Sequence, residues 1–146
     1  MCKQNKRILS FTFYALFLSF VTSSFAEEEK SPNHLEGTEK VNSEKLIQYV
    51  EGIPDLIIID SRIKIDRQLG YIEGSYSLPD VETSCATLAK ILPHKKSPAA
   101  FYCNGPKCGR SANAVKVAIK CGYTNTFWFR GGFEEWKKKK YPFVTN

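Results

Sequence analysis

Two cysteines and two basic residues lie close together in the chain and are suited to thiol chemistry. Cys103 ends an apolar run, Cys108 and Arg110 follow within seven positions, and Lys107 lies between them. A thiol reacts as its thiolate, and nearby cations or a helix N-terminus lower a thiol pKa from about 8.5 to roughly 3.5 to 7.5. The segment therefore predicts a nucleophilic cysteine, Cys103, that accepts sulfur or another soft electrophile.

The segment that carries these residues joins two predicted elements. A buried strand is expected at 99–103, and a helix with one apolar face at 111–123. In open parallel sheets, ligands bind beyond the carboxyl ends of the strands. The free N–H groups at the start of a helix attract anions. We therefore expect the connecting loop to hold a thiolate, and any anion bound to it, against backbone amides.

Short apolar runs alternate with helical patterns along the rest of the chain. Further strands are predicted at 56–60, 76–78 and 125–129, and further helices at 44–52, 81–92 and 133–140. Strands that alternate with helices indicate a parallel sheet covered on both faces. The predicted fold is therefore α/β, a small parallel sheet with helices on both faces.

The first 26 residues have the layout of a secretory signal peptide. Basic residues precede Ile8 to Val21, a stretch of 14 residues without charge, and small residues follow at Ser24 and Ala26. An uncleaved membrane anchor needs about 20 apolar residues, so cleavage after Ala26 is the favoured interpretation. This predicts a secreted or periplasmic protein that has no membrane association after cleavage.

Composition also divides the remaining chain. Residues 27–40 are polar and contain Pro32 and Gly37, which predicts a flexible tether before a domain at 41–146. The net charge is +6 over the whole chain, but three of the basic residues lie in the leader. The lysines at 137–140 have no interleaved aromatic residues, so they indicate a solvated helix face and no nucleic-acid partner.

Two other cysteines and both histidines are further candidate ligands. Cys85 and Cys121 occupy apolar positions of predicted helices, which favours buried thiols, with a disulfide between them as the alternative. Zinc sites use close-spaced ligand pairs. The cysteine spacings do not supply such pairs, and His34 and His94 stand alone in predicted loops. We therefore predict no metal and no cofactor.

Four segments, in order over residues 43–144, resemble the rhodanese-like domain of single-domain sulfurtransferases. They are LIIIDSR, GYIEGSYSLP, FYCNGPKCGRSANAV and GYTNTFWFRGGFEEW. The resemblance implies a cysteine that takes sulfane sulfur from a donor such as thiosulfate, becomes a persulfide, and passes the sulfur to a thiol or cyanide. It places Cys103 at the sulfur-accepting position and Arg110 with Ser111 at the Arg-Ser that ends the loop.

Further residues complete the expected site. The loop residues expected to bind substrate are Lys107, Gly105, Gly109 and Ser111, with Cys103 and Arg110 as catalytic residues. The resemblance implies structural roles for Asp60, Arg62, Gly131, Gly132 and Trp136.

The loop departs from the family pattern in two ways. The family places the arginine five residues after the cysteine, whereas Arg110 lies seven residues after Cys103. Cys108 is an additional thiol within the loop. It is interpreted as a resolving thiol that closes a disulfide with Cys103, as the sulfur carrier itself, or as a structural residue that pins the loop.

These residues are consistent with two functions. The first is an exported sulfurtransferase that forms a persulfide on Cys103, with a small sulfur donor, a thiol acceptor and a thiol-reducing partner protein. The alternative is a non-catalytic rhodanese-like module that binds a partner, or that responds to redox conditions through Cys103 and Cys108.

Overall fold

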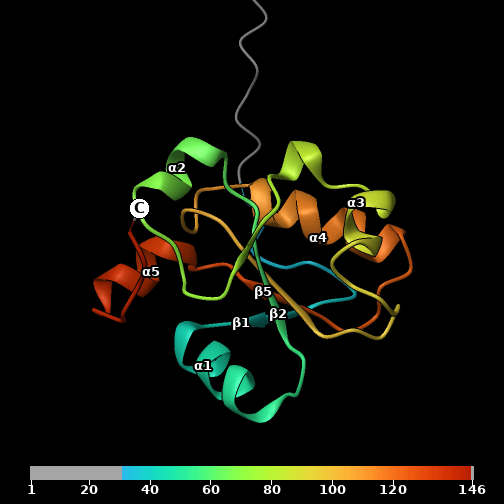
Figure 1. The fold of residues 1–146 in the computed structure, drawn as a ribbon, viewed down its shortest axis with the longest axis horizontal. Coiled ribbons are helices and arrows are strands. Elements are labelled where there is room, and N and C mark those ends of the chain that lie inside the picture. The colour runs from blue at the N-terminus through green and yellow to red at the C-terminus, as the bar shows by residue number, and fades with distance from the viewer. Residues whose placement is uncertain (1–30, 146) are drawn as a thin grey trace, which may run out of the picture.

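A single sheet of five parallel strands organises the protein (Figure 1). The computed structural model describes residues 31–145, so the predicted signal peptide at 1–26 lies outside the described residues. The strands are β1 (Glu39–Val41), β2 (Ile57–Asp60), β3 (Tyr76–Ser77), β4 (Ala99–Tyr102) and β5 (Thr126–Phe129). Their order across the sheet is β1-β5-β4-β2-β3, and all pairs are parallel.

Helices cover both faces of this sheet. They are α1 (Ser43–Gly52), α2 (Lys64–Gln68), the 3-10 helix η1 (Asp80–Glu82), α3 (Cys85–Ala89), α4 (Arg110–Lys120) and α5 (Gly132–Lys138). Helices α3 and α4 pack on one face, and α1 and α5 pack on the other. The predicted fold class is confirmed.

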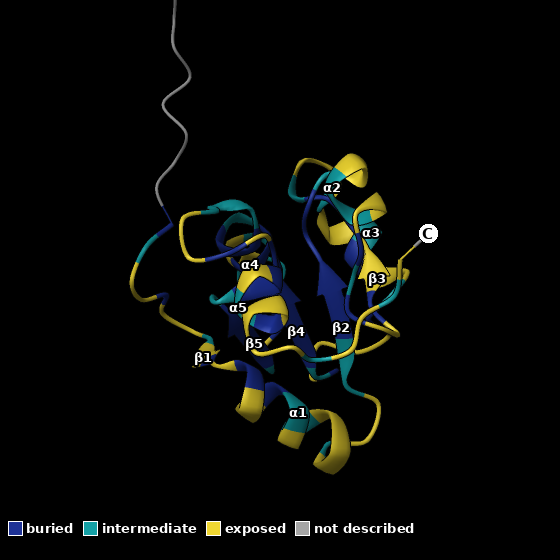
Figure 2. Cartoon of the chain, turned by 90° about the vertical axis from the view of Figure 1, so that its left-hand side faces the viewer, coloured by how far each residue is buried: buried dark blue, intermediate teal, exposed yellow. Residues whose placement is uncertain are grey.

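The core consists of two clusters because side chains alternate along each strand. On β4, Phe101 points toward α4 and Tyr102 points toward α5, and every residue of β4 is buried. Figure 2 shows the central strands in dark blue beneath partly exposed helices. Burial on both faces explains why β4 reads as an unbroken apolar run.

The strand register brings three loops to one edge of the sheet. Asp60 of β2 pairs with Tyr102 of β4, and Tyr102 pairs with Phe129 of β5. The strands therefore end at the same level, and Ser61, Cys103 and the loop after β5 begin side by side. This edge holds the candidate site.

The helix predicted at 81–92 is wrong in extent. Val81 is 79% exposed and lies in η1, and α3 begins only at Cys85. Ser84 caps α3 through a reciprocal capping box with Thr87, which fixes the start of the helix there.

The cysteine of α3 forms a disulfide with Cys121, which follows α4. Their Cα atoms are 5.4 Å apart, within the range that a disulfide allows. The favoured interpretation of Cys85 and Cys121 as buried thiols is therefore wrong, and the alternative describes the structure. Cys85 is exposed, so the bridge ties the two helices together at their surface.

Residues 31–40, within the predicted tether, pack against the domain. Leu35 joins the core, β1 pairs with the edge of β5, and Arg130 donates hydrogen bonds to the carbonyl oxygens of Pro32 and Ser31. Contacts that are made through backbone atoms do not depend on apolar side chains, so the polar composition that suggested a tether does not reveal them. None of the helices in the described part of the chain is long and apolar enough to cross a membrane.

Candidate functional site

The loop between β4 and α4 contains both free cysteines of the described residues. Cys103 follows β4 directly and is fully buried, whereas Cys108 is partly exposed. A hollow of about 280 Å³ opens above the loop. Its lining residues are Asp66, Asn104, Gly105, Lys107, Cys108, Arg110 and Glu134. Cys108 therefore presents its sulfur to a ligand, and Cys103 lies beneath it.

A chain of hydrogen bonds links Trp128, Ser111 and the two cysteines of the loop. The indole Nε1 of Trp128 lies 3.0 Å from Ser111 Oγ, and an indole N–H can only donate. Ser111 therefore accepts from Trp128 and turns its own proton toward Cys103 Sγ, 3.2 Å away. Cys103 in turn donates toward Cys108, whose carbonyl oxygen lies 3.1 Å from Cys103 Sγ.

Cys108 provides the last acceptor of this chain of hydrogen bonds. The hydrogen bond from the Cys103 thiol, the backbone N–H groups of Arg110 and Asn104, and the charge of Arg110 lower the pKa of Cys108 to about 6, against the opposing effect of burial. Arg110 is the first residue of α4, and its N–H has no partner within the helix. The start of α4 thus stabilises a thiolate on Cys108.

Cys103 has the opposite character. The hydrogen bond that it donates to Cys108, and then burial, raise the pKa of Cys103 above its usual range, although Ser111 acts in the other direction. The N–H groups of Asn104 and Arg110 act on Cys108, and among the named loop groups it is Ser111 that lowers the pKa of Cys103. The assignment of Cys103 as the catalytic residue stays a prediction.

The start of α5 holds the base of the loop. The N–H of Phe133 donates to the carbonyl of Cys103 at 2.9 Å, and the N–H of Glu134 donates to the carbonyl of Asn104 at 2.7 Å. Gly132 has a φ of +58°, and a Cβ atom at this position would collide with the carbonyl oxygen of Cys103. Glycine at 132 is therefore required by backbone conformation and by the close approach of the loop.

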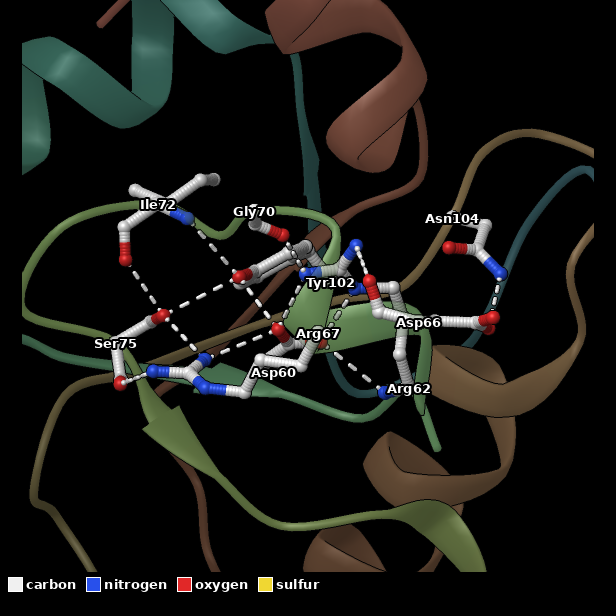
Figure 3. A network of polar contacts seen from close by, with 9 residues as sticks. All are labelled: Asp60, Arg62, Asp66, Arg67, Gly70, Ile72, Ser75, Tyr102 and Asn104. Atoms are coloured by element: carbon white, nitrogen blue, oxygen red, sulfur yellow. Dashed lines mark hydrogen bonds and ion pairs between the residues drawn. The ribbon is translucent and has the colours of Figure 1, made fainter. Parts of the chain in front are cut away.

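A buried polar network braces the neighbouring loop (Figure 3). Arg62 is 1% exposed and forms two hydrogen bonds to the carboxylate of Asp60, at 2.9 and 2.7 Å. Arg67 Nη1 lies 3.0 Å from the same carboxylate, and Tyr102 donates to it at 2.8 Å. Arg62 also donates to the carbonyl of Gly70 at 2.8 Å. The network fixes the segment from the end of β2 to Gly70.

This braced segment reaches the thiol loop through one hydrogen bond. The side-chain amide of Asn104 donates to Asp66 of α2 at 2.7 Å, as Figure 3 shows at its right-hand side. Arg62 Cζ also lies 4.4 Å above the ring of Phe133, which belongs to α5. The loop is therefore held from two directions, by α2 and by α5.

Charged groups of both signs surround the hollow. Arg110, expected to anchor an anionic donor, lies 3.0 Å from Asp80 and forms an ion pair with it. Lys107 is exposed at the rim, and Asp66 and Glu134 add two carboxylates to the lining. The hollow therefore presents both positive and negative groups to a ligand, and it is not a purely cationic anion-binding site.

The other predicted site residues have structural positions. Gly105 is buried against the side chain of Glu134, and Gly109 immediately precedes α4. Ser111 lies behind Cys103, where it does not face the hollow. Gly131 precedes α5, and Trp136 of that helix donates from Nε1 to the carbonyl of Pro142 at 2.8 Å.

Sequence reasoning missed three residues that contribute to the site. Trp128 reads only as an apolar strand residue, Asp80 lies between a predicted strand and a predicted helix, and Asp66 reads as a solvated acid. Their roles depend on partners far away in the chain, as in the pairing of Asp80 with Arg110. The local signals are Asp-Ser-Arg at the end of β2 and Gly-Arg-Ser at the start of α4, which mark the correct edge of the sheet.

Comparison with known proteins shows which family has this architecture. A family model described as a rhodanese-like domain matches residues 42–139. The rhodanese domain-containing protein CG4456 of Drosophila melanogaster is 30% identical over 105 residues, which cover 64% of this chain and 93% of the fly protein.

Two solved structures share the fold. The polysulfide-sulfur transferase homodimer of Wolinella succinogenes has a TM-score of 0.62 and 17% identity, over 75% of this chain and 80% of that one. Thiosulfate sulfurtransferase from Pseudomonas aeruginosa has a TM-score of 0.63 and 18% identity, over 74% of this chain and 20% of that one.

Proposed function

This chain belongs to the rhodanese-like domain family, and from that premise we propose that it is a sulfurtransferase. Its loop takes sulfane sulfur from a small donor as a persulfide and passes it to a thiophilic acceptor. One observation carries the proposal: Cys108 is a partly exposed cysteine that lines a hollow, where the buried Cys103 and the N–H groups of Arg110 and Asn104 lower its pKa. Such a thiolate is the nucleophile that the reaction needs.

We place the first sulfur transfer on Cys108. The Cys108 thiolate attacks the outer sulfur of thiosulfate, the S–S bond of the donor breaks, sulfite leaves with the electron pair, and Cys108 becomes a persulfide. The amides of Asn104 and Arg110 that face Cys108 then stabilise the anionic product. Family resemblance supports loading on Cys103 instead, but that residue is fully buried, and the neighbouring Cys108 and burial raise its pKa.

The proposed location is outside the cytoplasm. The leader-like residues 1–26 support export, and the Cys85–Cys121 disulfide belongs to a class of bond that persists in oxidising compartments. In such a compartment the two loop thiols need a reducing partner protein to remain active.

Mass mapping of the loop tests the function. The purified, reduced protein is treated with thiosulfate and digested with trypsin, which cuts after Lys107 and so separates the two cysteines. We expect a gain of about 32 Da, one sulfur atom, on the Cys108 peptide at the shortest reaction times, and thiocyanate when cyanide is added. A gain on Cys103 alone would reassign the carrier. No gain on either peptide together with no release of sulfide would overturn the sulfurtransferase proposal.

The rate of sulfur loading is expected to depend on pH with a midpoint near 6. A thiol whose pKa is lowered to about 6 is mostly thiolate at pH 7, so loading rises from pH 5 to 7 and is level above that. The rate of sulfur loading from thiosulfate, measured in reactions that are stopped at fixed times across pH 5 to 9, gives this profile. Cys103→Ala removes the largest cause of the lowered pKa and should move the midpoint upward. A wild-type midpoint near 8.5 contradicts the assignment.

A further inference from the structure

The buried thiol of Cys103 does not carry the sulfur in the proposed loading step, yet it contacts the residue that does. Its sulfur is fully buried, and its hydrogen-bond partners are Ser111 on one side and Cys108 on the other. We infer that Cys103 resolves the persulfide on Cys108, so that the loop reduces sulfane sulfur and releases it as hydrogen sulfide. This inference rests on the proposed function and names the fate of the sulfur.

The resolving step balances without an external reagent. The Cys103 sulfur attacks the inner sulfur of the Cys108 persulfide, and a Cys103–Cys108 disulfide forms. The bond between the two sulfurs of the persulfide breaks, and the outer sulfur leaves with the electron pair. The proton of Cys103 goes to the leaving sulfur, which departs as hydrosulfide. Over loading and resolution together, both cysteines are oxidised by one electron each, and the sulfane sulfur is reduced by two.

The loop geometry brings Cys108 back to the sulfur of Cys103. The N–H of Cys108 donates to the carbonyl of Gly105 at 2.9 Å, so the longer loop turns back over its own start. This turn leaves the carbonyl oxygen of Cys108 3.1 Å from Cys103 Sγ. The loop from Cys103 to Arg110 is two residues longer than in the family pattern. This extra length therefore allows a second cysteine to fold back against the first.

The hydrogen-bond chain sets the order of events. Before loading, the Cys103 thiol donates to the carbonyl oxygen of Cys108, and the neighbouring Cys108 side chain is the largest cause that raises the pKa of Cys103. Loading moves the negative charge from the Cys108 sulfur to the outer sulfur. The hydroxyl and the N–H of Ser111, which favour the Cys103 thiolate, remain in place. Cys103 thus becomes a nucleophile after Cys108 has been loaded.

Return to the dithiol form requires a reductant, which we assign to the class of dithiols. A dithiol attacks the disulfide, forms a mixed disulfide with one loop cysteine, and then closes its own disulfide. Cys108 is the accessible end of the loop pair, because Cys103 is fully buried. The net reaction consumes one sulfane sulfur and one dithiol and yields one hydrogen sulfide.

A single-turnover experiment tests the inference on the full, reduced protein. After free reductant is removed, thiosulfate is added in the absence of any other thiol, and sulfide, free thiols and tryptic peptides are measured. We expect close to one sulfide per chain, loss of two free thiols, and a peptide joined through Cys103 and Cys108. Addition of dithiothreitol should then restore turnover.

Two variants make the outcome decisive. Cys103→Ser should load sulfur on Cys108 but release at least about tenfold less sulfide until dithiothreitol is added. The double variant Cys85→Ser/Cys121→Ser, which removes the surface disulfide, should release as much sulfide as the wild type. Equal release from Cys103→Ser, or a stable persulfide in the wild type, overturns the inference. If neither the wild type nor any of the variants takes up sulfur from thiosulfate, the proposed function is refuted instead.

Discussion

Replacing Cys108 with serine is expected to reduce sulfur loading and thiocyanate formation by at least about 100-fold, as removal of an enzymatic nucleophile does. A serine hydroxyl is not ionised near neutral pH, so the hollow would hold no anionic nucleophile. Cys103 would remain, but its sulfur is fully buried below the loop. The measurement is the initial rate of thiocyanate formation from thiosulfate and cyanide, together with mass mapping of both cysteines.

The matched control is the corresponding change at the buried thiol. Serine at position 103 keeps a hydroxyl that can accept from Ser111 and donate to Cys108, so loading by Cys103→Ser should stay within about tenfold of the wild type. The reverse result, with Cys103→Ser inactive and Cys108→Ser active, would show that Cys103 carries the sulfur, as the family resemblance implies.

Much of the fold was predictable because its strands are buried on both faces. The runs around Ile57–Asp60, Ala99–Tyr102 and Thr126–Phe129 are continuous apolar segments, and each was placed to within one residue at either end. β1 and α2 were missed for a physical reason. β1 (Glu39–Val41) is a three-residue edge strand that buries only Val41, and α2 (Lys64–Gln68) has no buried residue, so neither carries an apolar pattern.

The position of the site was also predictable, but the division of labour between its thiols was not. Strand ends and the glycine-containing loop locate the site at the carboxyl edge of β4. The hydrogen bonds that reach Cys103 through Ser111 begin at Trp128, which can only donate. Trp128 is 25 residues from Cys103 in the chain, and no local pattern relates them.

The extended loop changes what the site can do. In the family pattern one cysteine stands at the end of the strand beneath the loop amides. Here the N–H groups of Asn104 and Arg110 face Cys108, and the cysteine at the strand end donates a hydrogen bond to it. The arrangement places a second cysteine against the first, and this pair is what the proposed two-electron reduction requires.

The second large effect is expected from the buried network, where Arg62→Met should reduce the free energy of unfolding by about 3 kcal/mol. Removal of one partner of a buried ion pair typically costs about 3 to 5 kcal/mol, because the other charge stays buried. Asp60 is fully buried, but Arg67 remains 3.0 Å from it, which favours the lower end of that range. Arg62 also supplies a hydrogen bond to Gly70.

Urea unfolding followed by tryptophan fluorescence measures this effect, with Lys64→Met as the control. Lys64 pairs with Glu82 at 3.1 Å, but both side chains are largely exposed, and such pairs contribute only about 0 to 1 kcal/mol. The double variant Asp60→Asn/Arg62→Met should be less destabilised than the sum of the two single variants, because no unpaired charge is left. If Arg62→Met and Lys64→Met unfold at the same urea concentration, Arg62 does not brace the segment that contacts the thiol loop.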